Sequence, residues 1–266
     1  MKQQKMKRKR DSSKRPKKDK SSKSGGGGGH LFTSASIDSL DSALSAYLLS
    51  PIAQSATFDN ELHAYKYVNA GVPITCGGLI NTLKYAYYPK YEDNYKKRRR
   101  KSAKLVGSTS KQGKQIDSEI AAVIEGRLRK KPHPMAEAIL KELKSMGHQL
   151  QAAQVPVPLA NNTLKMTQAD LITKDAFGML WLFELKSGQP VGFYRKQKNQ
   201  MHFEGKLNEV DCNGLNIWHL QLQYTRMALE AQKVPIRQAR IIQVYKNKDE
   251  GIIVKIHEQP KWIKKL

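Results

Sequence analysis

Residues 168–188 read QADLITKDAFGMLWLFELKSG, and this stretch decides the fold. Two apolar runs flank a polar turn at residues 174–178, a pattern typical of a β-hairpin. In the second run, residues 179–186, apolar side chains occupy both alternating sets of positions until the last residues. The pattern predicts a central strand that is buried on both faces.

The charged residues of this hairpin fall at matching levels. If the turn centres near Phe177, Asp170 lies across the hairpin from Glu184, and Lys186 projects from the same face as Glu184. Two carboxylates and one lysine then converge, and carboxylate oxygens are the ligands that Mg²⁺ prefers. A lysine beside the metal orients or helps to deprotonate the attacking water and neutralises phosphate charge. The alternative is a surface hairpin with solvated charges, since a Glu-x-Lys spacing alone occurs by chance.

Length and composition limit the class of protein. The chain has 266 residues, which suggests one domain of ordinary size plus extensions. It carries 47 Lys and Arg against 23 Asp and Glu, a formal charge of +24 that points first to nucleic acid and second to an anionic membrane surface. Cys76 and Cys212 form no disulfide framework. Without an apolar run long enough for a membrane span or a signal peptide, we expect a soluble intracellular protein.

Residues 1–30 form a basic tail with a glycine linker. The first 24 residues hold twelve Lys or Arg and almost no apolar side chain, so we expect disorder. Two basic clusters, residues 7–10 and 14–18, resemble a bipartite nuclear localisation signal. This predicts a nuclear import receptor as partner and the nucleus as location, with the cytoplasm or a virion as alternatives. A solvated tail that adds non-specific DNA affinity is the simpler interpretation, and the two are compatible.

Residues 31–110 are interpreted as a helical lead-in followed by a basic linker. Apolar spacing predicts helices over residues 36–48, 60–70 and 78–88. Several tyrosines then precede the basic run at residues 96–101. Aromatic and basic side chains together can stack bases and hold phosphates, but helix packing and an exposed linker are the favoured interpretation.

Residues 111–260 are expected to form the main domain. An apolar stripe predicts a helix over residues 113–128, and Glu119 lies on that stripe. A carboxylate on a core face needs a partner. The alternatives are a salt bridge, a helix that is rotated slightly, or a metal ion. A second helix is predicted over residues 134–146, and a strand at a sheet edge over residues 150–157.

The chain after the hairpin alternates between polar and apolar segments. A helix is predicted over residues 216–232, and two strands over residues 238–245 and 252–257. The polar loop after Gly188 either holds a phosphate backbone or is simple surface. Its predicted DNA-binding residues, together with one from the following helix, are Arg195, Lys196, Lys198, Lys206 and Arg226.

The order helix, strand, strand, strand, helix, strand, with acids at these places, resembles the PD-(D/E)XK nuclease superfamily. Within it, the chain is most similar to the RecB-like and lambda-type exonucleases, which include viral and phage recombination nucleases. The resemblance covers roughly residues 113–256. It implies an α/β fold: an αβββαβ core with a central mixed sheet flanked by helices, here extended by the helical lead-in and the disordered tail.

The resemblance also assigns the site residues. It implies that Asp170, Glu184 and Glu119 bind Mg²⁺, or Mn²⁺ in its place, with the carbonyl of Leu185 as a further ligand, and that Lys186 is catalytic. The family's glutamine on the helix after the site corresponds to Gln221, which the resemblance makes a catalytic residue that contacts the substrate or orients the site. Thr225 stands where that motif has tyrosine, and Ala169 where the family name has proline, so the chain departs from the pattern at both positions.

These residues predict a metal-dependent deoxyribonuclease, exonuclease-like, in DNA recombination, repair or genome processing. Single- and double-stranded DNA are both candidate partners, and no membrane is expected. One alternative is a non-catalytic DNA-binding or packaging protein built on a nuclease fold. The other is an RNA-directed nuclease, since the sequence has no feature that recognises a 2′-hydroxyl and so distinguishes RNA from DNA.

Overall fold

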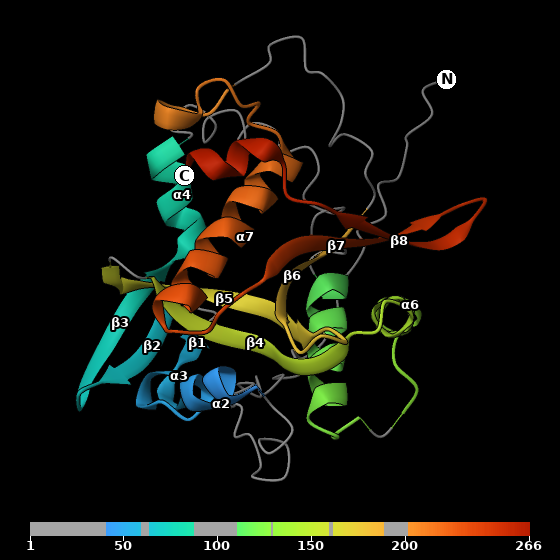
Figure 1. Cartoon of the computed structure of the whole chain (residues 1–266), viewed down its shortest axis with the longest axis horizontal. Coiled ribbons are helices and arrows are strands. Elements are labelled where there is room, and N and C mark those ends of the chain that lie inside the picture. Colours follow the sequence, from blue (N-terminus) through green and yellow to red (C-terminus); the bar gives the residue numbers. More distant parts are fainter. Residues whose placement is uncertain (1–40, 60–63, 88–110, 129, 160–161, 189–201) are drawn as a thin grey trace, which may run out of the picture.

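The computed structural model describes residues 41–59, 64–87, 111–128, 130–159, 162–188 and 202–266. One mixed sheet of eight strands organises them, in the order β1-β2-β3-β5-β6-β7-β8, with β4 paired to β5 outside that path. Helices cover the sheet, so that the fold is α/β (Figure 1). No helix in the described part of the chain is long and apolar enough to cross a membrane.

The N-terminal elements begin with two short helices and an antiparallel meander. The bounds are α2 Ser42–Leu48, α3 Pro51–Ser55, β1 Thr57–Asp59, β2 Ala64–Asn69, β3 Val72–Gly78 and α4 Leu79–Tyr87. The helix predicted over residues 60–70 is therefore wrong, because β2 occupies most of it. Tyr65 and Tyr67 are buried while Lys66 and Val68 are exposed, which is the alternation of a strand.

The rest of the chain follows the predicted order closely. Residues 111–124 form a helix, and α6, β4, β5 and β6 come next. After the undescribed segment 189–201 the chain continues through α7 to the hairpin of β7 and β8, with two short 3₁₀ helices, η1 and η2. The bounds are α6 Pro134–Ser145, β4 Gln149–Leu159, β5 Asn162–Lys174, β6 Leu180–Ser187, η1 Gly205–Leu207, α7 Gly214–Ala231, β7 Gln238–Asn247, β8 Gly251–His257 and η2 Lys261–Lys265.

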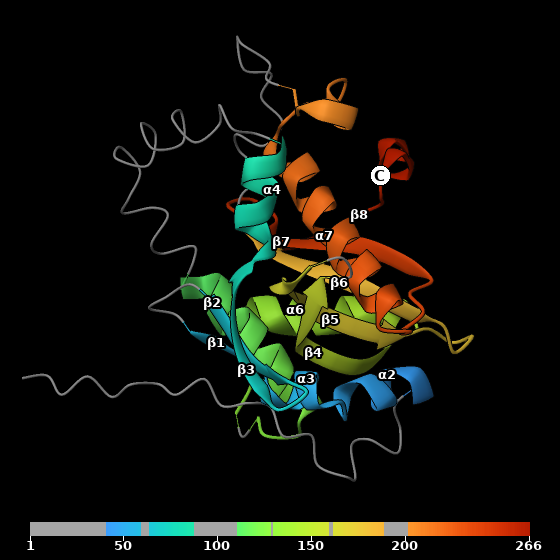
Figure 2. The ribbon, with the colours of Figure 1, turned by 90° about the vertical axis from the view of Figure 1, so that its left-hand side faces the viewer.

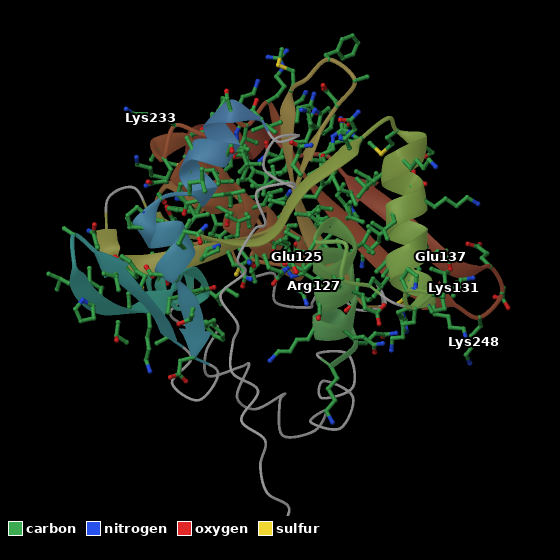
Figure 3. All side chains as sticks on the ribbon, turned by 90° about the horizontal axis from the view of Figure 1, so that it is seen from below. Glu125, Arg127, Lys131, Glu137, Lys233 and Lys248 are labelled. Carbon is green, nitrogen blue, oxygen red and sulfur yellow. The ribbon has the colours of Figure 1, made fainter. Side chains whose placement is uncertain are left out.

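Two hydrophobic clusters cover opposite faces of β6 and β7. Leu180 and Leu182 pack with α2 and α7, whereas the alternate residues Phe183 and Leu185 pack with α6 and the 111–124 helix. Figure 3 shows α6 and the 111–124 helix side by side, with Glu125 and Arg127 paired at the end of the 111–124 helix. The predicted central strand, buried on both faces, is confirmed in β6.

The edge of β5 is shared by two strands that leave a gap between them. β3 pairs with β5 only at Lys165 and Met166, and β6 pairs with it only from Leu171 onward. Among the described residues, positions 167–170 of β5 therefore have a strand partner on the β4 side alone. We call this interval the strand gap. The view in Figure 2 shows β3 and β6 approaching β5 at different levels.

The lead-in shares the core of the main domain, since Leu44 is fully buried in the same cluster as Leu182 and Leu222. Replacing Leu44 with Ala should lower the free energy of unfolding by about 2–5 kcal/mol, the usual cost of a large-to-small change in a core. Denaturant unfolding should show one transition for the whole protein. A loss below about 0.5 kcal/mol, as for a surface substitution, would contradict a shared core.

Candidate active site

The hairpin of β5 and β6 has the predicted register. The backbone pairs run from Lys174↔Leu180 to Leu171↔Phe183, so the next residues along each strand are Asp170 and Glu184. The ladder stops there because the strands separate. Instead of a backbone partner, the Leu185 N–H donates to Oδ2 of Asp170 at 2.9 Å. The predicted meeting of Asp170 with the end of β6 is confirmed, and it lies at the strand gap.

Lys186 completes this cluster and is held as a cation. Its ammonium donates to Oε1 of Glu184, and Nζ lies 5.8 Å from the centre of the Trp218 ring on α7. Burial lowers the pKa of Lys186, but the charges of Glu184 and Asp170 outweigh burial, and the net pKa is raised. Lys186 is thus protonated near neutral pH, which favours a role as a donor over one as a base.

Asp117 is a fourth member that the sequence analysis missed. It lies on the 111–124 helix, where burial and the charge of Asp170 raise its pKa to about 7 and Lys186 opposes them. The helix reaches the end of β6 because Gly113 is small: a Cβ there would come within 3.0 Å of Ser187 Oγ. Asp117 follows about one helical turn later.

The structure does not bring Glu119 to the cluster, which corrects its predicted place. Its carboxylate accepts hydrogen bonds from Gln115 Nε2 at 2.9 Å and from the backbone N–H of His133. Burial raises the pKa of Glu119, but these hydrogen bonds lower it further than burial raises it. Glu119 thus ties the helix to the segment before α6. Its partners are hydrogen-bond donors and neither the expected salt bridge nor the expected metal ion.

The two acids of this helix give a discriminating prediction. Asp117→Asn should reduce cleavage at least about tenfold, as expected for a group that tunes a metal site. Glu119→Gln should cleave normally but lose about 1–3 kcal/mol of stability, since a buried hydrogen-bonded network is disturbed. Activity assays and denaturant unfolding on both variants separate the roles. The assignment is reversed if Glu119→Gln is inactive and Asp117→Asn is not.

Gln154 also belongs to this neighbourhood. The register of β4 places Ala153 opposite Leu171 and Val155 opposite Ala169, so Gln154 lies opposite Asp170. Its backbone is left-handed, with φ +55°. The pKa of Asp170 is raised by burial, and Lys186, the Leu185 N–H and the Gln154 amide each act to lower it.

Helix α7 faces the strand gap with one side. Trp218 contacts Lys186, and Thr225 Oγ1 lies 2.8 Å from Oγ1 of Thr167 at the edge of the gap. Gln221 lies between these two along the helix, on the same side, so its position fits the predicted role, which stays a prediction. Tyr224 instead hydrogen-bonds to the hydroxyl of Tyr87 at 2.6 Å. Tyr224 therefore packs with α4.

The carboxylates are more numerous than the cations that could balance them. Burial and the nearby charge of Asp170 raise the pKa of Glu184 to about 8. One ammonium, Lys186, cannot neutralise Asp117, Asp170 and Glu184 together, so their mutual repulsion adds to burial in raising the pKa of Glu184 and of Asp117. Within the described ranges, no three His, Cys, Asp or Glu side chains are gathered closely enough to enclose an ion. A Mg²⁺ ion that keeps several waters needs only one or two carboxylates, and this donor set fits it.

The structure describes only some of the remaining residues that were predicted to bind metal or DNA. The structure shows the Leu185 N–H in use, and the predicted binding of metal by its carbonyl stays a prediction. Arg195, Lys196 and Lys198 lie outside the described residues, as do the basic tail and residues 96–101. Lys206 is exposed on η1. Arg226 is paired with Glu230 at 2.8 Å on the surface of α7.

The raised pKa values predict pH-dependent binding of Mg²⁺. Glu184 and Asp117, with pKa values of about 8 and about 7, hold protons in the folded chain that the unfolded chain has released. Without metal, stability should therefore fall as pH rises from the ordinary carboxyl range through about 8. A divalent cation displaces these protons, so Mg²⁺ should raise Tm more at about pH 8.5 than at about pH 6. Thermal melts at both pH values test this, and a pH-independent effect of Mg²⁺ would contradict it.

No protein-family model matches the chain, and a search of curated proteins finds no similar sequence.

Proposed function

We propose that this protein is a Mg²⁺-dependent deoxyribonuclease with a PD-(D/E)XK core. The observation that carries the proposal is the register that places Asp170 beside the end of β6, where Glu184 and Lys186 project from one face. The order of the 111–124 helix, β4, β5, β6, α7 and β7 supports it, because the superfamily has the same αβββαβ order. α6 is an additional helix in this series.

Asp170 and Glu184 would hold the ion, with Asp117 beside them. When bound, Mg²⁺ polarises the scissile phosphate and lowers the pKa of a bound water. Asp170 is oriented by the Leu185 N–H, which holds its Oδ2 at 2.9 Å beside the end of β6. Lys186 is held at the gap by Glu184 and Trp218, where its ammonium would orient the attacking water and balance the charge that develops on the phosphate.

The strand gap also explains how a phosphodiester would reach these groups. Within the described residues, positions 167–170 of β5 have no strand partner on this edge, and α7 covers it at Thr167, so the phosphodiester would approach from the Asp170 end of the gap. Glu184 is 1% exposed and the Lys186 side chain 20% exposed, with its ammonium turned to Glu184 and Trp218. An approaching phosphate would therefore meet the lysine side chain before the carboxylate.

The partner we propose is DNA, bound mainly through its phosphates. The net charge of +24 supports this, and each phosphate contact should steepen the salt dependence of binding by about 0.9 in the slope of log affinity against log salt. Lys206 and the basic segments outside the described residues would supply these contacts. An exonuclease-like role in recombination, repair or genome processing, and import to the nucleus through the basic tail, belong to the same proposal.

One experiment tests the activity and its substrate together. Purified protein is incubated with linear and circular DNA, single- and double-stranded, and with RNA of the same sequence, in Mg²⁺, in Mn²⁺ or in chelator. We expect metal-dependent cleavage of DNA, faster on linear than on circular molecules. Cleavage of RNA but not of DNA would support the alternative of an RNA-directed nuclease. Binding of DNA without cleavage in either metal would support a non-catalytic DNA-binding protein.

A further inference from the structure

Gln154 has a backbone conformation that its place in the fold does not require. Among the described residues, Ala70, Gln154 and Lys233 are the non-glycine residues with positive φ. Ala70 lies in the turn between β2 and β3, and Lys233 follows α7, where left-handed residues are common. Gln154 lies inside β4, where a left-handed residue is unfavourable. Strain of this kind persists where the surrounding structure enforces it, and it clusters at functional sites.

The side chain of Gln154 is locked in one orientation by Gln168. Gln168 Nε2 donates to Gln154 Oε1 at 2.7 Å and also to the backbone oxygen of Gln154 at 3.2 Å. If the nitrogen and oxygen of the Gln168 amide were exchanged, both of these hydrogen bonds would be lost. The orientation of the Gln168 amide is therefore fixed. Gln154 Oε1 is therefore an acceptor, and Nε2 must point to the other side.

The amide nitrogen of Gln154 is buried and has no acceptor at hydrogen-bonding geometry among the described residues, although it lies near enough to Asp170 to help lower the pKa of that carboxyl. A buried donor without a partner is costly, and natural proteins rarely keep one. The residue that faces it across the strands is Asp170. One oxygen of Asp170, Oδ2, already accepts from the Leu185 N–H, so the second oxygen has room for a further donor.

We propose that Gln154 is a positioning residue of the metal site, whose amide nitrogen donates to the Asp170 carboxylate when that carboxylate turns to bind a divalent cation. The inference rests on the proposed function, because it assumes that Asp170 is a metal ligand. Gln154 then holds Asp170 from the β4 side as Leu185 holds it from the β6 side. Hydrogen bonds from a second layer of residues orient metal ligands in this way, and their loss typically weakens metal binding about 10–100-fold.

Two variants and one control test this role. Gln154→Leu keeps the size of the side chain without the donor, and Gln154→Gly removes both the donor and the backbone strain. Lys233→Gly is the matched control, since it relieves a left-handed residue that projects from the surface after α7 (Figure 3). Binding of Ca²⁺ and Mn²⁺ is measured by calorimetry, which needs no turnover. The Mg²⁺ concentration for half-maximal cleavage and Tm are measured on the same proteins.

We expect both Gln154 variants to bind Ca²⁺ and Mn²⁺ at least about tenfold more weakly than the wild type. The Mg²⁺ requirement for cleavage should rise in parallel, whereas Lys233→Gly should change Tm alone. If the wild type binds metal but does not cleave nucleic acid, the nuclease proposal fails while weaker binding by the Gln154 variants still supports this inference. If the wild type cleaves and both Gln154 variants bind metal as it does, the inference is overturned and the nuclease proposal stands. Absence of metal binding by the wild type overturns the inference as well.

Discussion

Glu184→Gln and Asp170→Asn should each abolish Mg²⁺-dependent cleavage. The amides preserve the size and shape of the side chains, but one remaining carboxylate cannot hold a hydrated ion tightly beside the scissile phosphate. Both positions contribute to one constellation, with Asp170 hydrogen-bonded to the Leu185 N–H and Glu184 to Lys186. Because the substitutions act on one unit, the double variant should be little worse than either single variant.

The loss should be specific to the chemical step and to the metal. DNA binding without metal should persist in both variants, as measured by fluorescence anisotropy. Asp175→Asn is the matched control, because this aspartate lies on the same hairpin but serves its turn by accepting from Phe177 N and Met179 N, at 2.9 Å each. It should keep full activity below its melting temperature. Wild-type cleavage by Glu184→Gln would remove the cluster from catalysis.

Lys186→Met should slow cleavage at least about a hundredfold, which is the usual contribution of a positioned proton donor or acceptor. Its ammonium is held beside Glu184 and over Trp218, and the methionine keeps the apolar stem without the charge. The substitution leaves both carboxylates in place and removes the cation that Lys186 places beside them, so Mg²⁺ should still bind. The rate constant should fall with little change in the affinity for DNA.

Single-turnover kinetics at saturating Mg²⁺ and DNA measure this loss directly. Lys248→Met offers the control, since Lys248 is exposed at the turn between β7 and β8 (Figure 3). It removes the same charge from the protein and should change only the salt dependence of binding. A Lys186→Met protein with the wild-type rate would show that this lysine has no part in the reaction.

The centre of the site could be predicted because its geometry is local. The hairpin turn fixes the register of β5 and β6, since Asp175 and Gly178 form the turn and Gly178 has a positive φ of 79°. Once the register is set, the level of Asp170 relative to Glu184 follows from strand geometry alone. The predicted strands β7 and β8 and the helices α4, α6 and α7 rest on equally local patterns.

The choice between the two acids of the 111–124 helix could not be predicted. Asp117 and Glu119 flank opposite edges of the stripe formed by Ile116 and Ile120. Either one reaches the site if the helix turns slightly about its axis. The direction is set by how Ile116 and Ile120 pack in the core, and only the folded chain shows it.

The strand gap could not be predicted either, because it depends on contacts between distant segments. β3 meets β5 through Gly77 and Gly78, far from β5 in sequence. Because residues 60–70 were expected to be a helix, the meander of β1, β2 and β3 was not predicted. The alternation of Tyr65 and Tyr67 with Lys66 and Val68 was the signal for a strand. Gln154 was missed because a left-handed residue inside a strand leaves no mark in the sequence.

The central claim is that a divalent ion binds at the strand gap between Asp170 and Glu184. Anomalous scattering from crystals grown with Mn²⁺ tests it most directly, because the ion is located without assuming any activity. The account predicts a peak at coordinating distance from carboxylate oxygens of both Asp170 and Glu184, absent in crystals of Asp170→Asn. Crystals of the wild-type protein with no Mn²⁺ at the gap, or with Mn²⁺ only elsewhere, would contradict it.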